Sequence, residues 1–121
     1  MIHNQIHIRA EFSIDKKKVD EFKRLIQKMS KIVEANEPDT IQYQFYLNGD
    51  GTKCIVHETY TDSEATLVHN ESLASKTILP KIFNVAKMDK LDVYGNPNGA
   101  LQNLLRNHNT QIYNLVTGFN R

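Results

Sequence analysis

The chain has little of what would indicate a disulfide framework or a nucleic-acid surface. It contains a single cysteine, Cys54, and therefore cannot form an internal disulfide. Because Cys54 lies in an apolar segment, we expect a small buried side chain rather than a reactive thiol. Fifteen basic and fourteen acidic residues leave a formal charge of +1, so the charge balance favours neither nucleic acid nor an anionic membrane.

Long apolar runs are also missing. No stretch approaches the ~18 consecutive apolar residues that span a bilayer, and the sequence has no secretion or lipidation signal. We therefore expect a cytoplasmic protein that binds neither membranes nor nucleic acid. No pair of histidines has the spacing of metal ligands on a predicted helix, so we predict no metal site.

The length and composition are those of one globular domain. The 121 residues are 40% hydrophobic and 24% charged, values that are ordinary for a globular protein. A chain of this size forms a core, but part of its apolar surface is expected to be buried by self-association. We expect a single domain over residues 1–121.

The segment 37–70, EPDTIQYQFYLNGDGTKCIVHETYTDSEATLVHN, predicts a strand, a tight turn, a second strand and a helix in succession. Apolar and polar residues alternate over 41–47, which indicates a strand with one buried face. The glycines of the sequence NGDG supply the backbone freedom of a tight turn. A second strand is expected over about 53–60, and the capping box Thr61 to Glu64 predicts a helix start.

The remaining chain completes an α+β fold. A strand over 2–14 leads through the N-cap Asp15 into a long amphipathic helix that ends near Ala35. Helical segments after the hairpin are kinked or split by Pro80. A strand over 88–94 then gives the order β-α-β-β-α-β, the ferredoxin-like topology of an antiparallel sheet with helices on one face.

Residues 100–121 form a C-terminal extension beyond this topology. The sequence predicts a short helix over 101–106 and an extended segment over 111–116. We expect this extension to pack on a neighbouring subunit or to add a strand to it. The sheet face opposite the helices is half polar and half aromatic, which favours a homodimer in which two sheets pack into an α+β barrel.

Glu58 is the first candidate for chemistry. By strand alternation it shares the apolar face with Cys54, Val56 and Tyr60, whereas the adjacent His57 points to the other face. A carboxylate on an apolar face needs a partner or has a raised pKa, as in a general base or a buried ion pair. Arg9 and His69 are both possible partners.

The histidines and tyrosines near the hairpin each have two interpretations. His69 is either a base whose ordinary pKa of ~6.5 suits proton transfer, or a cation at a helix C-terminus. His57 is either a pocket residue or a hydrogen-bonded histidine at the dimer interface. Tyr43 belongs to the apolar face of its strand. Tyr46 belongs to the polar face, where it lines either a pocket or the dimer interface. The hydroxyl of either tyrosine can donate a hydrogen bond to a quinone oxygen.

The block EPDT…GDGTK…VHETYTDSEA…H, with LDVYGNP and the ending GFNR, resembles the antibiotic biosynthesis monooxygenase family. The likeness is greatest to its small quinol monooxygenase-like members. The resemblance implies dimers of ferredoxin-like subunits. It also implies oxidation of quinols or polycyclic phenols by O2 without a flavin, haem or metal cofactor, although relatives on this fold also degrade haem or isomerise lactones.

The resemblance therefore implies an oxidoreductase, a cofactor-independent monooxygenase that acts on a quinol or related small aromatic. His69 matches a histidine that often stands at this place in the family. We expect His69 and Glu58 to be catalytic and a further set of residues to bind substrate, namely Tyr43, Tyr46, His57, Tyr60 and Asn70.

Two other functions are considered. Relatives that oxidise anthrones or degrade haem use a tryptophan in this helical region, and this chain has no tryptophan. One alternative is a non-catalytic dimer that binds a small ligand or acts in stress. The other is haem binding or degradation, with His69 or His57 as the iron ligand.

Overall fold

The computed structural model describes residues 4–121, so the first two residues of the expected strand over 2–14 lie outside the described residues. Five strands form one sheet in the order β2-β3-β1-β4-β5. Neighbouring strands are antiparallel except β4 and β5, which are parallel. The strands are β1 (Ile6–Ile14), β2 (Thr40–Leu47), β3 (Lys53–Tyr60), β4 (Ala86–Tyr94) and β5 (Gln111–Tyr113).

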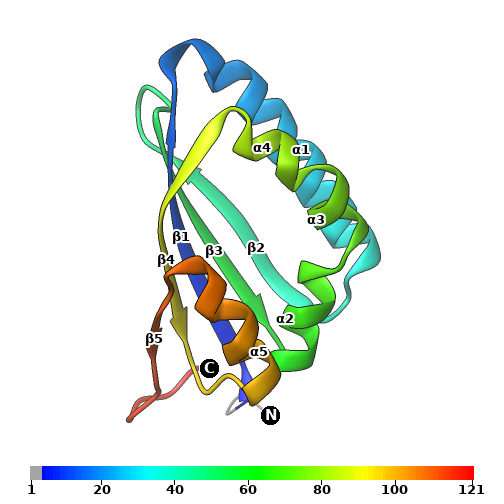
Figure 1. Ribbon diagram of the computed structural model, residues 1–121, viewed down its shortest axis with the longest axis vertical. Helices are drawn as coiled ribbons and strands as arrows, with labels where there is room; N and C mark the ends of the chain where they lie inside the picture. The colour runs from blue at the N-terminus through cyan, green and yellow to red at the C-terminus, as the bar shows by residue number, and fades with distance from the viewer. Residues whose placement is uncertain (1–3) are drawn as a thin grey trace.

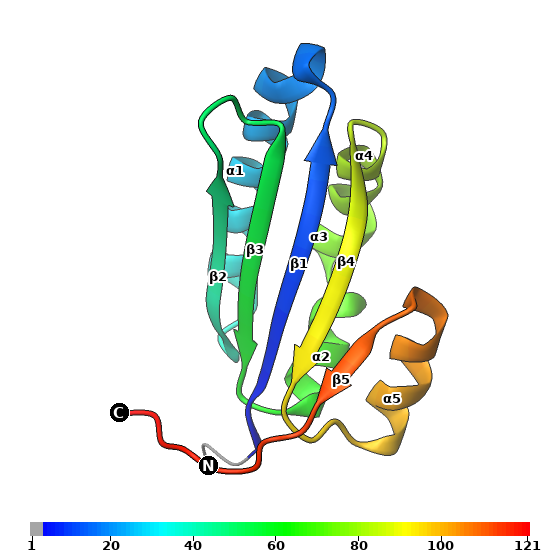
Figure 2. The ribbon, with the colours of Figure 1, turned by 90° about the vertical axis from the view of Figure 1, so that its left-hand side faces the viewer.

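The helices cover one face of the sheet and leave the other face open (Figures 1 and 2). Within residues 4–121, no helix combines the length and apolar character that crossing a membrane requires. The helices are α1 (Val19–Asn36), α2 (Ser63–Asn70), α3 (Leu73–Thr77), α4 (Leu79–Phe83) and α5 (Gly99–Leu105), with 3-10 turns at η2 (Lys16–Lys18) and η3 (Arg106–His108). The ferredoxin-like α+β fold is thus confirmed.

The core forms where the apolar face of the sheet meets the apolar stripe of α1. Alternate residues of β1 are buried, and Phe22, Met29 and Val33 of α1 pack against them. Each fully buried side chain of this size contributes roughly 1.5–3 kcal/mol to the free energy of unfolding. Asp15 begins the helical segment as expected, because its side chain accepts a hydrogen bond from the Lys17 amide at 2.9 Å.

The structure corrects the expected strand and helix starts near the hairpin. Ile41 is 51% exposed because an irregularity in the β2–β3 register between Thr40 and Gln42 removes it from the buried face. The N-cap of α2 is Asp62 rather than Thr61, since its Oδ1 accepts from the Ala65 amide at 2.8 Å.

Pro80 splits the helical segment after α2 into α3 and α4 and stands in the first turn of α4. Proline is tolerated there because the first-turn amides have no partner inside the helix. The hairpin turn depends on Gly51, which has a φ of 77° and whose hypothetical Cβ would lie 2.5 Å from Val19 Cγ1. No residue with a side chain fits this position without strain.

The C-terminal extension differs from the expected arrangement in one respect. Residues 111–113 form β5 and pair with β4 of the same chain, so this part adds a strand to its own sheet rather than to a neighbour's. The backbone hydrogen bond from the Gly95 amide to the Tyr113 carbonyl, 2.9 Å long, holds this end of β5 against the sheet. Contact between residues 114–121 and a second subunit stays a prediction.

Candidate active site

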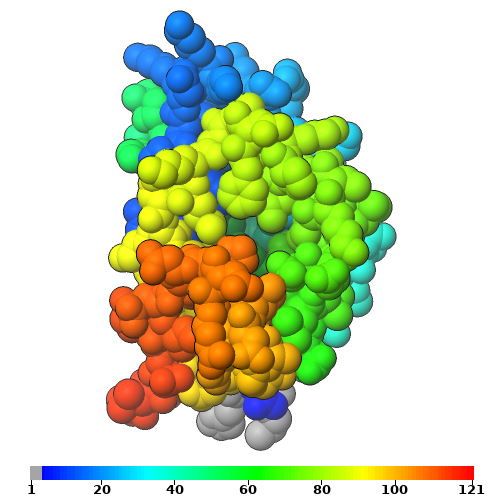
Figure 3. Space-filling view, in the orientation of Figure 1, coloured from blue at the N-terminus to red at the C-terminus, as the bar shows by residue number. Residues whose placement is uncertain are grey.

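A cavity of about 140 Å³ lies between the sheet and the helices. Figure 3 shows a hollow on this face, bordered by α5 on one side and by the segment containing α3 and α4 on the other. Its walls are mainly apolar, with Ile8, Phe12, Met29, Val56, Leu79, Ile82, Met88 and Leu91 among the lining residues. Such a cavity excludes water from what it binds and strengthens the electrostatic interactions inside it.

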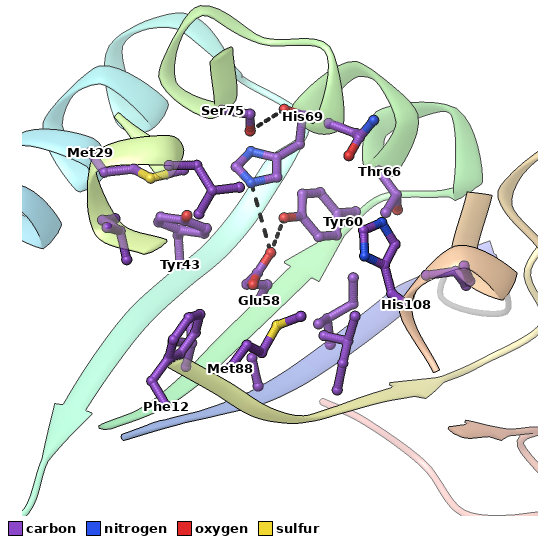
Figure 4. Close-up of a pocket in the computed structure, with 18 of the residues that line it drawn as sticks. Phe12, Met29, Tyr43, Glu58, Tyr60, Thr66, His69, Ser75, Met88 and His108 are labelled. Atoms are coloured by element: carbon purple, nitrogen blue, oxygen red, sulfur yellow. Dashed lines mark hydrogen bonds and ion pairs between the residues drawn. The ribbon is translucent and has the colours of Figure 1, made fainter. Parts of the chain in front are cut away.

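A few polar side chains enter this apolar space from different elements. Tyr43 comes from β2, Glu58 and Tyr60 come from β3, and His69 comes from the last turn of α2 (Figure 4). The His69 ring lies between the two tyrosines, with centroid separations of 5.2 Å to Tyr43 and 5.5 Å to Tyr60. The hairpin and the capped helix α2 therefore place one imidazole at the polar end of the cavity.

Glu37 holds the far side of the His69 ring. Its Oε1 lies 2.7 Å from His69 Nδ1, and the Glu37 side chain is only 4% exposed. The same oxygen accepts a hydrogen bond from Thr40 Oγ1 at 3.1 Å. A carboxylate against Nδ1 favours the neutral tautomer with its proton on Nδ1, so Nε2 is left as the acceptor.

The free Nε2 of His69 points toward Glu58, whose Oε1 is 3.9 Å away. Tyr60 Oη donates a hydrogen bond to the same carboxylate oxygen. The main chain of His69 is also fixed, because Ser75 Oγ donates to the His69 carbonyl at 2.6 Å. The arrangement is an oriented base beside a second carboxyl group.

Burial raises the pKa values of three groups around His69. Desolvation raises the pKa of Glu58, and the neighbouring His69 and the Tyr60 hydroxyl only partly oppose this. The pKa values of Tyr43 and Tyr60 are well above the usual phenol value, chiefly because of burial and then because of the charge on Glu58. Both tyrosines therefore remain neutral and can donate hydrogen bonds.

Most of the residues expected in the site lie together. Tyr43, Glu58, Tyr60, His69 and Asn70 all line the cavity. The partner of Glu58 is therefore His69.

Other expected residues lie elsewhere. His57 and Tyr46 lie on the open face of the sheet, where their ring centroids are 5.2 Å apart, and neither lines the cavity. Arg9 pairs with Glu11 at 2.5 Å rather than with Glu58. Cys54 is fully buried and burial raises its pKa to about 11, as expected for an inert side chain.

Glu37 and His108 were not expected in the site. Glu37 follows α1, where a negative charge meets the negative end of the helix dipole. This unfavourable placement is the signal in the sequence that the carboxylate has another partner. His108 lines the cavity from η3, and no spacing in the sequence relates it to the hairpin.

The sequence profile of the antibiotic biosynthesis monooxygenase family matches residues 5–81, which include the whole Glu37, Glu58, Tyr60 and His69 cluster. The chain belongs to this family. A comparison with curated protein sequences finds no match.

Several solved structures share the fold of this family member. MupZ from Pseudomonas fluorescens is 23% identical, with a TM-score of 0.83 over 98% of this chain and 95% of its own. A conserved protein from Methanosarcina mazei Go1 is 21% identical, with a TM-score of 0.67 over 78% of this chain and 94% of its own. A Caulobacter crescentus CB15 protein named for the same family is 19% identical, with a TM-score of 0.68 over 80% of this chain and 93% of its own.

The raised pKa of Glu58 predicts a pH dependence of stability. The unfolded state loses the Glu58 proton near pH ~4.3, whereas the folded state keeps it to higher pH. The unfolded state therefore binds fewer protons in this window, and Glu58 lowers the free energy of unfolding as pH rises from ~4.3 to the folded pKa. The Glu58→Gln variant should lack this contribution. We therefore expect urea unfolding to show that wild type loses stability relative to the variant as pH rises through this window.

The matched control is Glu34→Gln, because Glu34 is exposed on α1 and does not line the cavity. The difference in the free energy of unfolding between wild type and this control should vary less with pH. The raised pKa of Glu58 would be contradicted if the difference in the free energy of unfolding between wild type and Glu58→Gln stayed constant with pH. It would also be contradicted if wild type gained stability relative to the variant as pH rises.

Proposed function

We propose that this protein is a cofactor-independent monooxygenase that oxidises a hydroquinone or a related small aromatic with O2. The observation that supports this function best is the buried contact between Glu37 and His69, which leaves His69 Nε2 as a base facing an apolar cavity. The family membership supports a monooxygenase. The substrate and the residue roles are our proposal.

The first step is removal of a proton from a substrate hydroxyl by His69 Nε2. Glu37 then stabilises the imidazolium, because its carboxylate lies 2.7 Å from Nδ1. The resulting phenolate is a better electron donor than the neutral phenol. The neutral hydroxyl of Tyr43 is a donor close to His69 that can stabilise the developing negative charge on oxygen.

Glu58 has a different role from His69. Its Oε1 lies 3.9 Å from His69 Nε2, and the hydrogen bond from Tyr60 fixes the orientation of its carboxyl group. We assign Glu58 to stabilising the imidazolium that forms when His69 takes the substrate proton, rather than to removing that proton. Asn70 also lines the cavity, and we assign it to contact with the substrate ring.

The overall reaction balances without a cofactor. A hydroquinone and O2 give a hydroxylated quinone and water, so one oxygen atom enters the ring and the other leaves as water. The substrate supplies all the electrons, through oxidation of the quinol to the quinone and of one ring carbon from C–H to C–OH. The cavity of about 140 Å³ is smaller than the ~300–1,000 Å³ of pockets for drug-sized ligands, which favours a substrate with one ring.

Oxygen consumption with a series of hydroquinones tests this proposal. We expect His69→Gln and Glu37→Gln each to lower kcat/KM at least about tenfold, or ~1.4 kcal/mol of transition-state stabilisation, because the first removes the base and the second the charge that stabilises it. The Glu34→Gln control should match wild type. With ¹⁸O₂, the product should carry one labelled oxygen atom.

Oxygen consumption no faster than the uncatalysed rate with every hydroquinone would contradict the proposal. In that case a non-catalytic ligand-binding protein becomes the better interpretation. Consumption that is unchanged in His69→Gln would instead contradict the assignment of the base.

We also propose that the protein is a homodimer that joins through the open face of the sheet. This face carries the exposed side chain of Tyr46, and no helix within residues 4–121 covers it (Figure 2). The exposed apolar residues Leu115, Val116 and Phe119 of the C-terminal segment would add to the buried area. A face that combines exposed aromatic side chains with polar groups suits a self-complementary interface between two copies of the chain.

Sedimentation at micromolar concentration tests the dimer. We expect a species of twice the chain mass of 14.0 kDa, and we expect Tyr46→Glu to shift it toward the monomer because a charge is placed in the interface. Val68→Glu is the control, since Val68 is also an exposed hydrophobic residue but lies on α2. A 14.0 kDa species alone in wild type would contradict the dimer.

A further inference from the structure

The C-terminal extension forms a wall of the cavity. Leu101, Leu104 and Leu105 of α5 and His108 of η3 all line it, although they lie outside the residues that match the family profile. Leu101 and Leu105 are buried in the core cluster that includes Ile8 and Tyr60. The cavity is therefore completed by a segment that the matched part of the chain does not contain.

This wall is held in a fixed position. Asn98 caps α5 through a hydrogen bond from the Leu101 amide to its Oδ1, 2.9 Å long. The backbone amide of Asn98 in turn donates a hydrogen bond to Ser63 Oγ of α2 at 3.0 Å. Since α2 also carries His69, one helix connects the two sides of the cavity.

His108 is the polar group that this wall contributes. Figure 4 shows its ring pointing into the cavity from η3, near Thr66, whereas Tyr43 and His69 enter from β2 and α2. Within residues 4–121 the His108 ring makes no hydrogen bond to another residue. Thr66 is already engaged, because its hydroxyl donates to the Asp62 carbonyl at 3.0 Å.

The cavity thus receives polar groups from two parts of the chain. His69 and Glu58 enter it from α2 and β3, and the solvent-exposed His108 enters it from η3, while Ile8, Met88 and Leu91 are among the apolar lining residues. A ring with one oxygen atom at His69 and a second within reach of His108 would hydrogen-bond to both. A ring with only one oxygen atom would make one hydrogen bond fewer, and His108 would stay hydrated.

We propose that His108 binds the second oxygen substituent of the aromatic substrate, so that the protein selects rings with two oxygen atoms over rings with one. The role of His69, which takes the proton from the first oxygen substituent, rests on the proposed function. His108 is a binding residue in this proposal and takes no part in the proton transfer.

Anaerobic calorimetric titration tests the proposal without turnover. The probes are hydroquinone and 4-methylphenol, which differ in one hydroxyl group that is replaced by a methyl group of similar size. We expect wild type to bind hydroquinone more tightly than 4-methylphenol. His108→Ala should raise the Kd of hydroquinone about five- to tenfold and change that of 4-methylphenol by less than about twofold.

Two further variants separate a lost hydrogen bond from a disturbed wall. His108→Gln keeps a donor and should recover part of the preference for hydroquinone. Asn107→Ala lies in the same turn, is exposed and does not line the cavity, so it should bind both probes as wild type does. Equal weakening of both probes in His108→Ala, or no change in either, would overturn the proposal.

Oxygen consumption separates this inference from the proposed function. If wild type oxidises hydroquinone and His108→Ala raises KM while kcat is nearly unchanged, both stand. If wild type oxidises hydroquinone and His108→Ala has the wild-type KM, the role of His108 is wrong and the function stands. If the binding preference depends on His108 but no oxygen is consumed, the binding role stands and the monooxygenase is wrong.

Discussion

The candidate site depends on the buried contact between Glu37 and His69. A neutral histidine in an apolar cavity has two tautomers, and the carboxylate at 2.7 Å from Nδ1 selects the one that leaves Nε2 free as a base. The contact therefore determines which ring nitrogen of His69 faces the cavity.

The fold brings this pair together from distant parts of the chain. Glu37 follows the end of α1, and His69 lies at the end of α2. Both helices pack on the same face of the sheet, while β3 passes beneath them and contributes Glu58 and Tyr60 (Figure 1). The open opposite face leaves a surface for self-association, so one sheet separates the chemistry from the proposed dimer contact.

Much of this arrangement could be predicted from the sequence, because strand and helix periodicity are local. Alternation along β3 is enough to place Glu58 with Tyr60 and to turn His57 to the other face. The irregularity that exposes Ile41 has no such signal, since it appears only when β2 and β3 pair.

The approach of Glu37 to His69 also depends on tertiary packing, as does the closing of the cavity by His108. Periodicity gives the face on which a side chain lies but not the partner that it meets there. The placement of β5 in its own sheet is a further case, because a short extended segment can pair equally well within a chain or between chains.

The most direct test of the account is ¹⁵N NMR of the His69 ring at a pH at which it is neutral. The account predicts a protonated Nδ1 and an unprotonated Nε2, and it predicts that the Glu37→Ala variant shifts this population toward the other tautomer. A neutral His69 with its proton on Nε2 in wild type would contradict the account, because no base would then face the cavity.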